Sequence, residues 1–375
     1  MSAHSVLAPS SAGRIVQCPG SVPMSKAYSE AGDSPDAMDG VAAHWACSEM
    51  LEGRLVEVGQ QAPNGVFLTD EMVEAADLYF DDVATTLAAH GLKTTDAAIE
   101  AAVSIPAVHE LCWGTPDARA WVPGKILYLW DFKFGHRIVD VFENWQLIAY
   151  VSGCLSGVNL NDQEVTVVCR IVQPRAYHRD GAIREWRFNA AEIRAHVNIL
   201  RNAAHQALAA NPPTRVGVYC RDCTARRACV TLQRAALSAC DVAGDAQPFD
   251  LPTSAMGTEL RYLKRAAAVL DARISGLEEQ ALARAKRGDL VPGWRVAQGL
   301  GRERWARPAA EVILVAEMLG VKVAKPPTAL TPKQAIKAGL DASVVAAMSE
   351  TPRGEVTLVE DDGSRARSIF GRLPR

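Results

Sequence analysis

The segment from Gly114 to Gly135, GTPDARAWVPGKILYLWDFKFG, constrains the fold more than any other part of the sequence. Its centre, ILYLWDFKF, is almost wholly apolar, which is typical of a buried strand. Two charged side chains, Asp131 and Lys133, interrupt it near its end. Because residues two apart on a strand point to the same side, we expect these charges to project together. Charges at the end of a buried strand are costly unless they bind something.

The apolar pattern elsewhere predicts a sheet covered by helices. Apolar residues recur at three- and four-residue spacing in some segments, whereas others are short β-branched and aromatic runs between turn signals. The predicted helices are Ala37–Leu51, Asp70–His90, Glu143–Leu155 and Ala190–Ala210. The predicted strands are Asp117–Val122, Ile126–Phe132, Arg137–Val141 and Glu164–Val172. This order of elements is typical of an α/β core.

The composition changes beyond the predicted core. Gln247–Pro252 is typical of a linker, and Gly257–Arg287 is a charged, alanine-rich stretch that predicts a long helix. A chain of 375 residues is long enough for more than one domain. We therefore predict a boundary near residue 245, between a domain over 1–245 and a mainly helical accessory domain over 246–375.

The nine cysteines divide into single ones and a cluster. The N-terminus lacks a basic start with an apolar run, and no apolar segment approaches the roughly 20 residues of a membrane span. We therefore expect a cytoplasmic protein without membrane contact, whose thiols stay reduced. The single cysteines are most simply small buried hydrophobes: Cys47, Cys112, Cys154, Cys169 and Cys240. The cluster CRDCTARRAC, with Cys220, Cys223 and Cys229, indicates a disulfide framework, a zinc site or an iron–sulfur cluster.

The distribution of charge leaves nucleic acid open as a partner. The formal net charge is −3, which by itself argues against binding to phosphate. Lys and Arg nevertheless outnumber Asp and Glu over Pro212–Ala239 and over Arg261–Arg307. Such local basic surfaces are compatible with a phosphate backbone, and equally with solvated helix faces.

The charged residues around the buried strand are suited to metal-assisted hydrolysis. Asp117 and Asp131 offer oxygen ligands that can share a hard divalent cation such as magnesium. Lys133 can then orient water or stabilise developing charge. Gln146 and Tyr150 are four residues apart and share one helical face. His44 lies within a predicted helix, where a partly buried histidine without a ligand role is the simpler interpretation of that residue alone.

These residues occur in an order that resembles a known family. His44, Gly114-x-x-Asp117, Asp131-x-Lys133 and Gln146-x-x-x-Tyr150 are similar to the motifs of RecB-type PD-(D/E)XK nucleases. The opening LAPSSAGRIVQCPGS is similar to the start of the AddB and CRISPR-associated iron–sulfur exonucleases, and the likeness is greatest to a phage and prophage family. It covers roughly residues 5–235. Many relatives have Glu where this chain has Asp131, and both residues satisfy the pattern.

The resemblance implies a fold and a cofactor for the cysteines. It implies a restriction-endonuclease-like core, with a central mixed sheet flanked by helices, followed by the mainly helical C-terminal domain. In the relatives one cysteine before the core joins three after it, which implies a 4Fe–4S cluster held by Cys18, Cys220, Cys223 and Cys229 as a structural cross-link. Zinc with four sulfurs remains the alternative, because spacing alone does not exclude it.

The resemblance also implies an activity. It is that of a metal-dependent exonuclease on linear DNA in phage recombination or replication, encoded by a phage or prophage. Mg²⁺ or Mn²⁺ is expected at His44, Asp117, Asp131 and the carbonyl of Phe132. Lys133 is expected to assist the attacking water, and Gln146 and Tyr150 to position DNA or Lys133. A non-catalytic nucleic-acid-binding factor and a zinc-stabilised interaction protein are the rival interpretations.

Two further places are predicted to contact partners. Arg175, after the fourth predicted strand, either contacts phosphate or lies in a simple turn. In the C-terminal region, aromatic and arginine residues alternate in a way that suits stacking on unpaired bases, although a helical core with buried tryptophans fits slightly better. These residues are Trp294, Arg302, Arg304 and Trp305. The resemblance is also compatible with a phage single-strand annealing or recombination protein as a partner.

Overall fold

The computed structural model describes residues 5–28, 35–157, 165–243 and 252–294, with the single positions 296, 314, 318 and 343. Contacts along the chain divide it into two compact units. One comprises Met1–Pro292 with Ser368–Arg375, and the other comprises Gly293–Arg367. All the elements that position the candidate site belong to the first unit.

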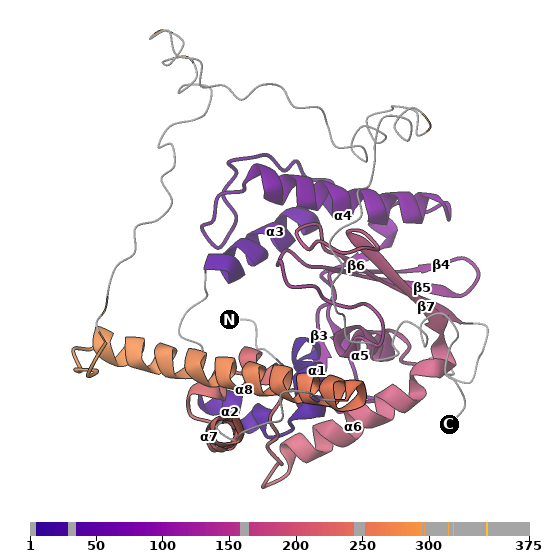
Figure 1. Cartoon of the computed structure of the whole chain (residues 1–375). Helices are drawn as coiled ribbons and strands as arrows, with labels where there is room; N and C mark the ends of the chain where they lie inside the picture. The colour runs from indigo at the N-terminus through magenta and orange to yellow at the C-terminus, as the bar shows by residue number, and fades with distance from the viewer. Residues whose placement is uncertain are drawn as a thin grey trace. The chain divides into compact units, whose positions relative to one another are not determined.

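A mixed sheet of five strands forms the centre of the first unit (Figure 1). Its strands follow in the order β1 (Ala98–Ile99), β4 (Ala118–Val122), β5 (Ile126–Phe132), β6 (Thr166–Val172) and β7 (Ile183–Asn189). β5 and β6 run parallel, whereas the other neighbouring pairs are antiparallel. A separate two-stranded sheet pairs β2 (Val103–Ser104) with β3 (Trp113–Gly114).

β5 lies in the middle of the sheet and is buried on both faces. Its side chains alternate, so that Leu127 and Leu129 pack into one hydrophobic core while Trp130 and Phe132 pack into another. Asp131 points to the same face of β5 as Leu127 and Leu129, and it is only 3% exposed. The near-continuous apolar run is therefore explained by helices on both sides, as the sequence predicted.

The helices α3 (Pro35–Leu51) and α4 (Asp70–Ala88) cover one face of the sheet (Figure 1). Their buried side chains share a core with Trp130 and Phe132. Thr69 caps α4, because its hydroxyl accepts the Met72 N–H at 3.3 Å. Both helices coincide closely with their predicted ranges.

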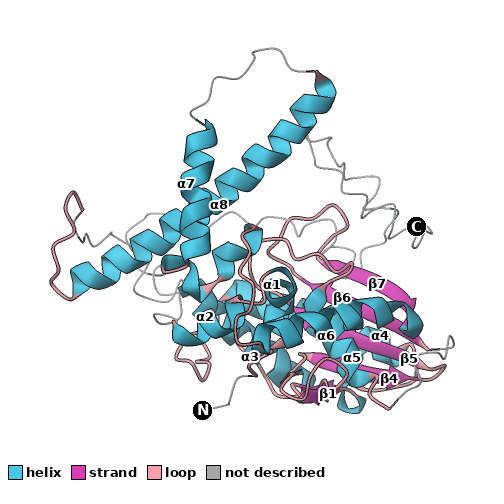
Figure 2. Cartoon of the chain, turned by 90° about the horizontal axis from the view of Figure 1, so that it is seen from below, coloured by secondary structure: helices cyan, strands magenta, loops and turns pink. Residues whose placement is uncertain are grey.

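The opposite face is covered by α5 (Trp145–Cys154) and α6 (Arg194–Leu208), as the view in Figure 2 shows. Parallel neighbours such as β5 and β6 require a crossover connection, and α5 provides it. Asn144 caps α5 by accepting the N–H groups of Gln146 and Leu147 at 3.0 and 3.3 Å. The chain is thus an α/β protein with a mixed sheet flanked by helices, which confirms the predicted fold class at this level.

Further helical elements complete the described part of the first unit. They are η1 (Pro9–Ser11), α1 (Ala12–Gln17), α2 (Ser21–Ala27), η2 (Thr94–Asp96), η3 (Ala190–Ile193), η4 (Val218–Asp222), η5 (Thr224–Arg227), α7 (Val230–Ala243) and α8 (Thr253–Lys286). In the described part of the chain, no helix is both long and apolar enough to cross a bilayer.

α8 follows the boundary that the sequence predicts near residue 245, and it belongs to the first unit. Its buried residues Val269 and Ala272 share a small core with Leu232 and Ala236 of α7 and with Cys220. Composition does not show this packing, because burial of α8 depends on residues distant in sequence.

Two glycines of α8 give a matched test of this packing. A Cβ at Gly276 would lie 2.8 Å from the Arg227 backbone N, whereas a Cβ at Gly257 meets nothing within 4 Å. We expect Gly257→Ala to stabilise the protein by up to ~1 kcal/mol through helix propensity. Gly276→Ala should destabilise it by ~1–3 kcal/mol, because η5 must move away. Thermal melting of both variants tests this, and equal melting shifts would contradict the close packing.

One predicted strand is absent, and four observed strands were not predicted: the short β1, β2 and β3, and the longer β7. The prediction of a strand at Arg137–Val141 is wrong, because no strand in the described part of the chain pairs with this segment. Side chains of Gln173 and Arg184 bind its backbone groups instead. β7 follows a turn-rich loop and lies at an edge of the sheet. It carries Arg184, Glu185 and Arg187 among its seven residues, so its apolar signal in the sequence is weak.

Candidate active site and cysteine site

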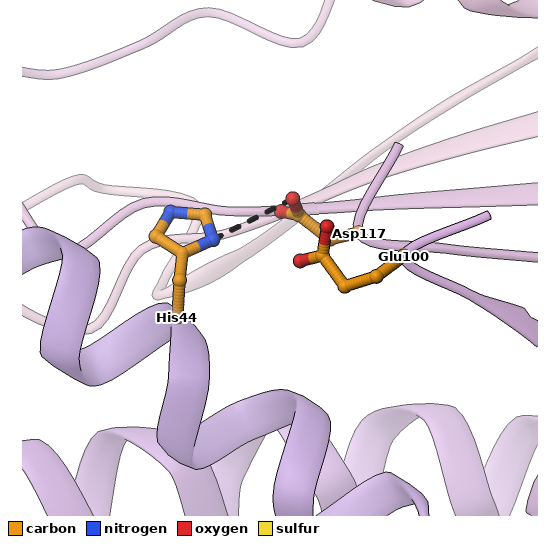
Figure 3. A group of neighbouring side chains, drawn as sticks. All are labelled: His44, Glu100 and Asp117. Atoms are coloured by element: carbon orange, nitrogen blue, oxygen red, sulfur yellow. Dashed lines mark ion pairs between the residues drawn. The ribbon is translucent and has the colours of Figure 1, made fainter. Parts of the chain in front are cut away.

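Three side chains from separate elements meet at one edge of the sheet (Figure 3). His44 comes from α3, Glu100 follows β1, and Asp117 immediately precedes β4. One ligand atom from each lies within 4.8 Å of the other two, and His44 Nδ1 lies 3.5 Å from Asp117 Oδ1. No other trio of His, Cys, Asp or Glu in the described ranges meets this criterion. An imidazole with two carboxylates is a donor set that suits a divalent cation.

Glu100 was not among the predicted site residues. Its backbone has a φ of 44°, in the left-handed region that a residue with a side chain rarely adopts. The Glu100 N–H donates to the Asp117 carbonyl at 3.0 Å, which holds the two residues side by side. The sequence around it, AAIEAAV, carries no motif, so only the pairing of β1 with β4 shows its place.

The three groups shift one another's pKa values. Burial opposes protonation of His44, but the Asp117 carboxylate outweighs it and raises the His44 pKa. Burial would raise the Asp117 pKa, yet His44, Lys133 and the Phe132 N–H together lower it. Burial and then the negative charge of Asp117 raise the pKa of Glu100 to about 7. The residue as a whole is exposed, but its carboxyl end is turned toward the other two groups.

Asp131, Lys133 and Gln146 form a second group at the end of β5. Lys133 Nζ lies 3.0 and 2.9 Å from the two carboxylate oxygens of Asp131. The Gln146 amide donates to Asp131 Oδ1 at 3.0 Å and accepts from Lys133 Nζ at 3.4 Å. The two charges therefore project together, as the spacing predicts. Asp131 is not part of the His44 trio, so its role as a metal ligand stays a prediction.

The charge states within this second group follow from its burial and pairing. Burial, and then Asp117, raise the pKa of Asp131 against the opposing effect of Lys133. Burial lowers the pKa of Lys133, but Asp131 and Asp117 outweigh it and raise that pKa. Lys133 is thus a cation held in a buried setting by two carboxylates, where its field acts strongly on nearby groups.

Phe132 connects the two groups across the sheet. Its N–H donates to Asp117 Oδ2 at 2.6 Å, and its ring meets the His44 ring edge-on at 5.2 Å between centroids. Because neighbouring residues of a strand point to opposite faces, His44 and Asp131 approach the end of β5 from opposite sides. No contact identifies the Phe132 carbonyl as a metal ligand, which stays a prediction.

Tyr150 supports the site by binding the backbone just before Asp117. Its hydroxyl donates to the Thr115 carbonyl at 3.0 Å, which fixes the turn just before Asp117. A Cβ at Gly114 would lie 3.0 Å from the Tyr150 ring and 2.8 Å from Pro9, so a glycine allows this close approach. Burial, and then the charges of Asp117 and Asp131, raise the pKa of Tyr150, and its hydrogen bond with Gln146 opposes this only in part. Tyr150 thus supports the Asp117 turn and contacts Gln146.

The four predicted cluster cysteines come together from the two ends of the first unit. Cys18 ends α1, Cys220 lies in η4, Cys223 separates η4 from η5, and Cys229 precedes α7. Backbone N–H groups of Arg215 and Leu232 donate to the sulfurs of Cys18 and Cys229 at 3.3 and 3.4 Å.

The pKa shifts of Cys18 and Cys220 indicate that the four cysteines lie close together. Burial is the largest effect and raises the pKa of Cys18, and it raises that of Cys220 to about 11. The charges of Cys223 and Cys229 raise both values further. Four thiolates in one place repel one another, so the arrangement suits a cation or cluster that neutralises them. Of the cysteines predicted to be buried singly, three are buried, whereas Cys154 is half-buried and Cys240 is exposed.

An ion pair joins the cysteine site to the strand end. Arg137, four residues after Lys133, forms two contacts of 3.0 Å with the carboxylate of Asp222. Asp222 lies between Cys220 and Cys223, and its carbonyl also accepts from Arg14 near the N-terminus. The cysteine segment, the N-terminal helices and the loop after β5 therefore meet at one residue.

The predicted nucleic-acid contacts are placed only in part. Arg175 packs over the Phe134 ring at 4.4 Å and pairs with Glu71 at 2.9 Å, so it is engaged inside the protein. Trp294 is 72% exposed. Arg302, Arg304 and Trp305 lie outside the described residues.

The chain matches a protein-family model over most of its length. The family model described as "Protein of unknown function (DUF2800)" matches residues 4–366, which is almost the entire chain.

Proposed function

We propose a hydrolytic function for this chain, which belongs to the DUF2800 family. The proposed reaction is metal-dependent hydrolysis of phosphodiester bonds in linear DNA, as in the RecB-type nucleases that its motifs resemble. The observation that carries the proposal is the meeting of His44, Glu100 and Asp117 beside the paired charges of Asp131 and Lys133.

The donor set fits the metals that such a reaction uses. Two carboxylates and one imidazole bind Mn²⁺ well, and carboxylates with water bind Mg²⁺. Burial and then the Asp117 charge raise the pKa of Glu100, and a bound cation would offset that repulsion. A divalent ion held there supplies positive charge at the scissile phosphate and acidifies water.

The chain's own residues supply the remaining functions. Lys133, fixed by Asp131 and Gln146, donates hydrogen bonds to the attacking water or to a phosphate oxygen. Asp131 keeps Lys133 charged and aimed in one direction. Gln146 restrains both partners at once, so the lysine does not swing toward solvent. Tyr150 fixes the turn from which Asp117 projects.

We further propose that the four cysteines hold a 4Fe–4S cluster as a structural cross-link. The proximity of the four thiols supports the proposal, since the charges of Cys223 and Cys229 act on both Cys18 and Cys220. Zinc with four sulfurs is the alternative, which the metal content of the protein decides.

The substrate and partners follow from the resemblance. We propose an exonuclease acting on linear DNA in phage recombination or replication, with a single-strand annealing or recombination protein as a partner. Trp294 and the arginines beyond it are proposed as DNA contacts, whereas Arg175 is already engaged by Glu71 and Phe134.

A nuclease assay tests the proposal directly. Anaerobically purified protein is incubated with Mg²⁺ or Mn²⁺ and with linear or covalently closed DNA of the same sequence. We expect loss of the linear form alone, and complete protection by EDTA. Tight DNA binding without hydrolysis would instead support the non-catalytic binding factor.

Metal binding should depend on pH through Glu100. Its pKa of about 7 lies above the ordinary carboxyl value, so the carboxyl is largely protonated below pH 7 and must lose its proton to bind a metal. We expect Mn²⁺ affinity to rise with pH up to about 7, by about tenfold per unit for each proton released. Glu100→Gln should weaken binding and reduce this slope by about one proton. Titration calorimetry across this range measures both, and an unchanged slope would exclude Glu100 as a ligand.

A further inference from the structure

Gln173 is a fully buried amide whose hydrogen-bonding capacity is entirely used. It follows β6 directly and is 0% exposed. Its amide nitrogen donates to the carbonyls of Gly135 and Arg137 at 2.8 and 2.6 Å. Its oxygen accepts from the Val139 N–H at 3.0 Å and from Arg184 at 2.7 Å. Two donors and two acceptor positions are all that a glutamine amide possesses.

Arg184 extends this clamp from β7. It is 5% exposed and also donates to the Val139 carbonyl at 2.9 Å. Gln173 and Arg184 together therefore bind both backbone groups of Val139. The sequence predicts a strand over 137–141, which would need a neighbouring strand as its hydrogen-bond partner. Side chains bind its backbone groups instead, and they fix an otherwise irregular segment.

The clamped segment leads directly from Lys133 to α5. At its far end the Asn144 amide donates to the Asp140 carbonyl at 2.9 Å. The Asn144 oxygen accepts the Gln146 N–H, which starts α5. The Gln146 side chain then reaches Asp131 at 3.0 Å. A continuous path of hydrogen bonds and short backbone links thus runs from Gln173 to the carboxylate at the end of β5.

We propose that Gln173 is a positioning residue for the Asp131–Lys133–Gln146 group. With Arg184 it holds the segment after Lys133, which sets the start of α5 and thereby the place of Gln146. The inference rests on the proposed nuclease function. It extends that function to a residue that touches neither metal nor substrate. A displacement of about 1 Å at reacting groups lowers rates by about 10²-fold, so a buried clamp of this kind matters.

Hydrogen exchange tests the path in the metal-free full-length protein. Gln173→Ala removes the acceptor of the Val139 N–H. We expect faster exchange at Val139, Gln146 and Leu147 together. The matched control is Arg170→Gln, on the same strand β6, which loses partly buried ion pairs to Asp82 of α4 and Glu185 of β7. It should lower the melting temperature without affecting these three amides.

Kinetics on linear DNA with Mn²⁺ provide the second measurement. Gln173→Ala should lower kcat by about 10- to 100-fold with little change in KM, since the residue does not contact DNA. The double variant with Gln146→Ala should be hardly slower than Gln146→Ala alone, because both changes remove the same restraint. Arg170→Gln should leave kcat of the folded fraction unchanged.

Specific results would overturn the proposal. Fast exchange at Val139 with unchanged protection at Gln146 and Leu147 would break the path, and so would fully additive losses in the double variant. If Gln173→Ala does not fold, Arg184→Lys, which keeps the charge but loses the two-point contact, takes its place in both measurements. Absence of hydrolysis by the wild-type protein would refute the nuclease function, whereas the exchange experiment would still decide whether the clamp positions Gln146.

Discussion

Asp131→Asn is expected to lower the rate of DNA hydrolysis by about 10²–10³-fold while the protein stays folded. Asparagine has nearly the same shape, but it removes the charge that pairs with Lys133 at 2.9 Å. The lysine then loses the partner that keeps it charged and directed, and the site loses a carboxylate. Single-turnover rates on linear DNA with Mn²⁺ measure the effect, with the melting temperature as a check on folding.

Asp82→Asn is the matched control for this change. Asp82 is a partly buried carboxylate that binds Arg170 at 2.8 Å and Trp130 at 3.0 Å, away from the site. We expect it to lower stability while the rate per folded molecule stays the same. Full activity of Asp131→Asn, or an equal loss in both variants, would reject the role assigned to Asp131.

Cys18→Ser is expected to abolish the brown colour and visible absorption of anaerobically prepared protein. One of four ligands would be lost, and with it the cross-link between Cys18 and the cysteines near residue 220. A cross-link that closes a loop of about 200 residues contributes about 5 kcal/mol in the chain-entropy description. We therefore expect a large fall in melting temperature, together with loss of bound iron.

Cys112→Ser is the control for the replacement of a thiol by a hydroxyl. Cys112 is 3% exposed and donates to the Leu7 carbonyl at 3.2 Å, a bond that a serine can keep. Cys112→Ser should retain full iron content. Iron that survives Cys18→Ser unchanged would separate the N-terminus from the cysteine site, and colourless protein with one bound zinc would establish the structural alternative.

The local sequence pattern was sufficient to predict much of the sheet and the helices around it. The range predicted for β5 is the observed one, because a continuous apolar run needs cover on both faces wherever it lies. The pairing of Asp131 with Lys133 followed in the same way from the two-residue repeat of a strand. The segment 137–141 has strand-forming residues too, but it has no partner strand, and pairing is decided by neighbours far along the chain.

The sequence by itself determined which residues lie at the end of β5 and on the facing side of α5, because helix and strand periods link residues a few positions apart. Only the tertiary structure decided that Glu100 joins His44 and Asp117, and that α8 packs on the cysteine segment. It also decided that Gln173 replaces a strand partner. Such contacts join residues whose separation in sequence carries no periodic signal, so they depend on the path of the whole chain.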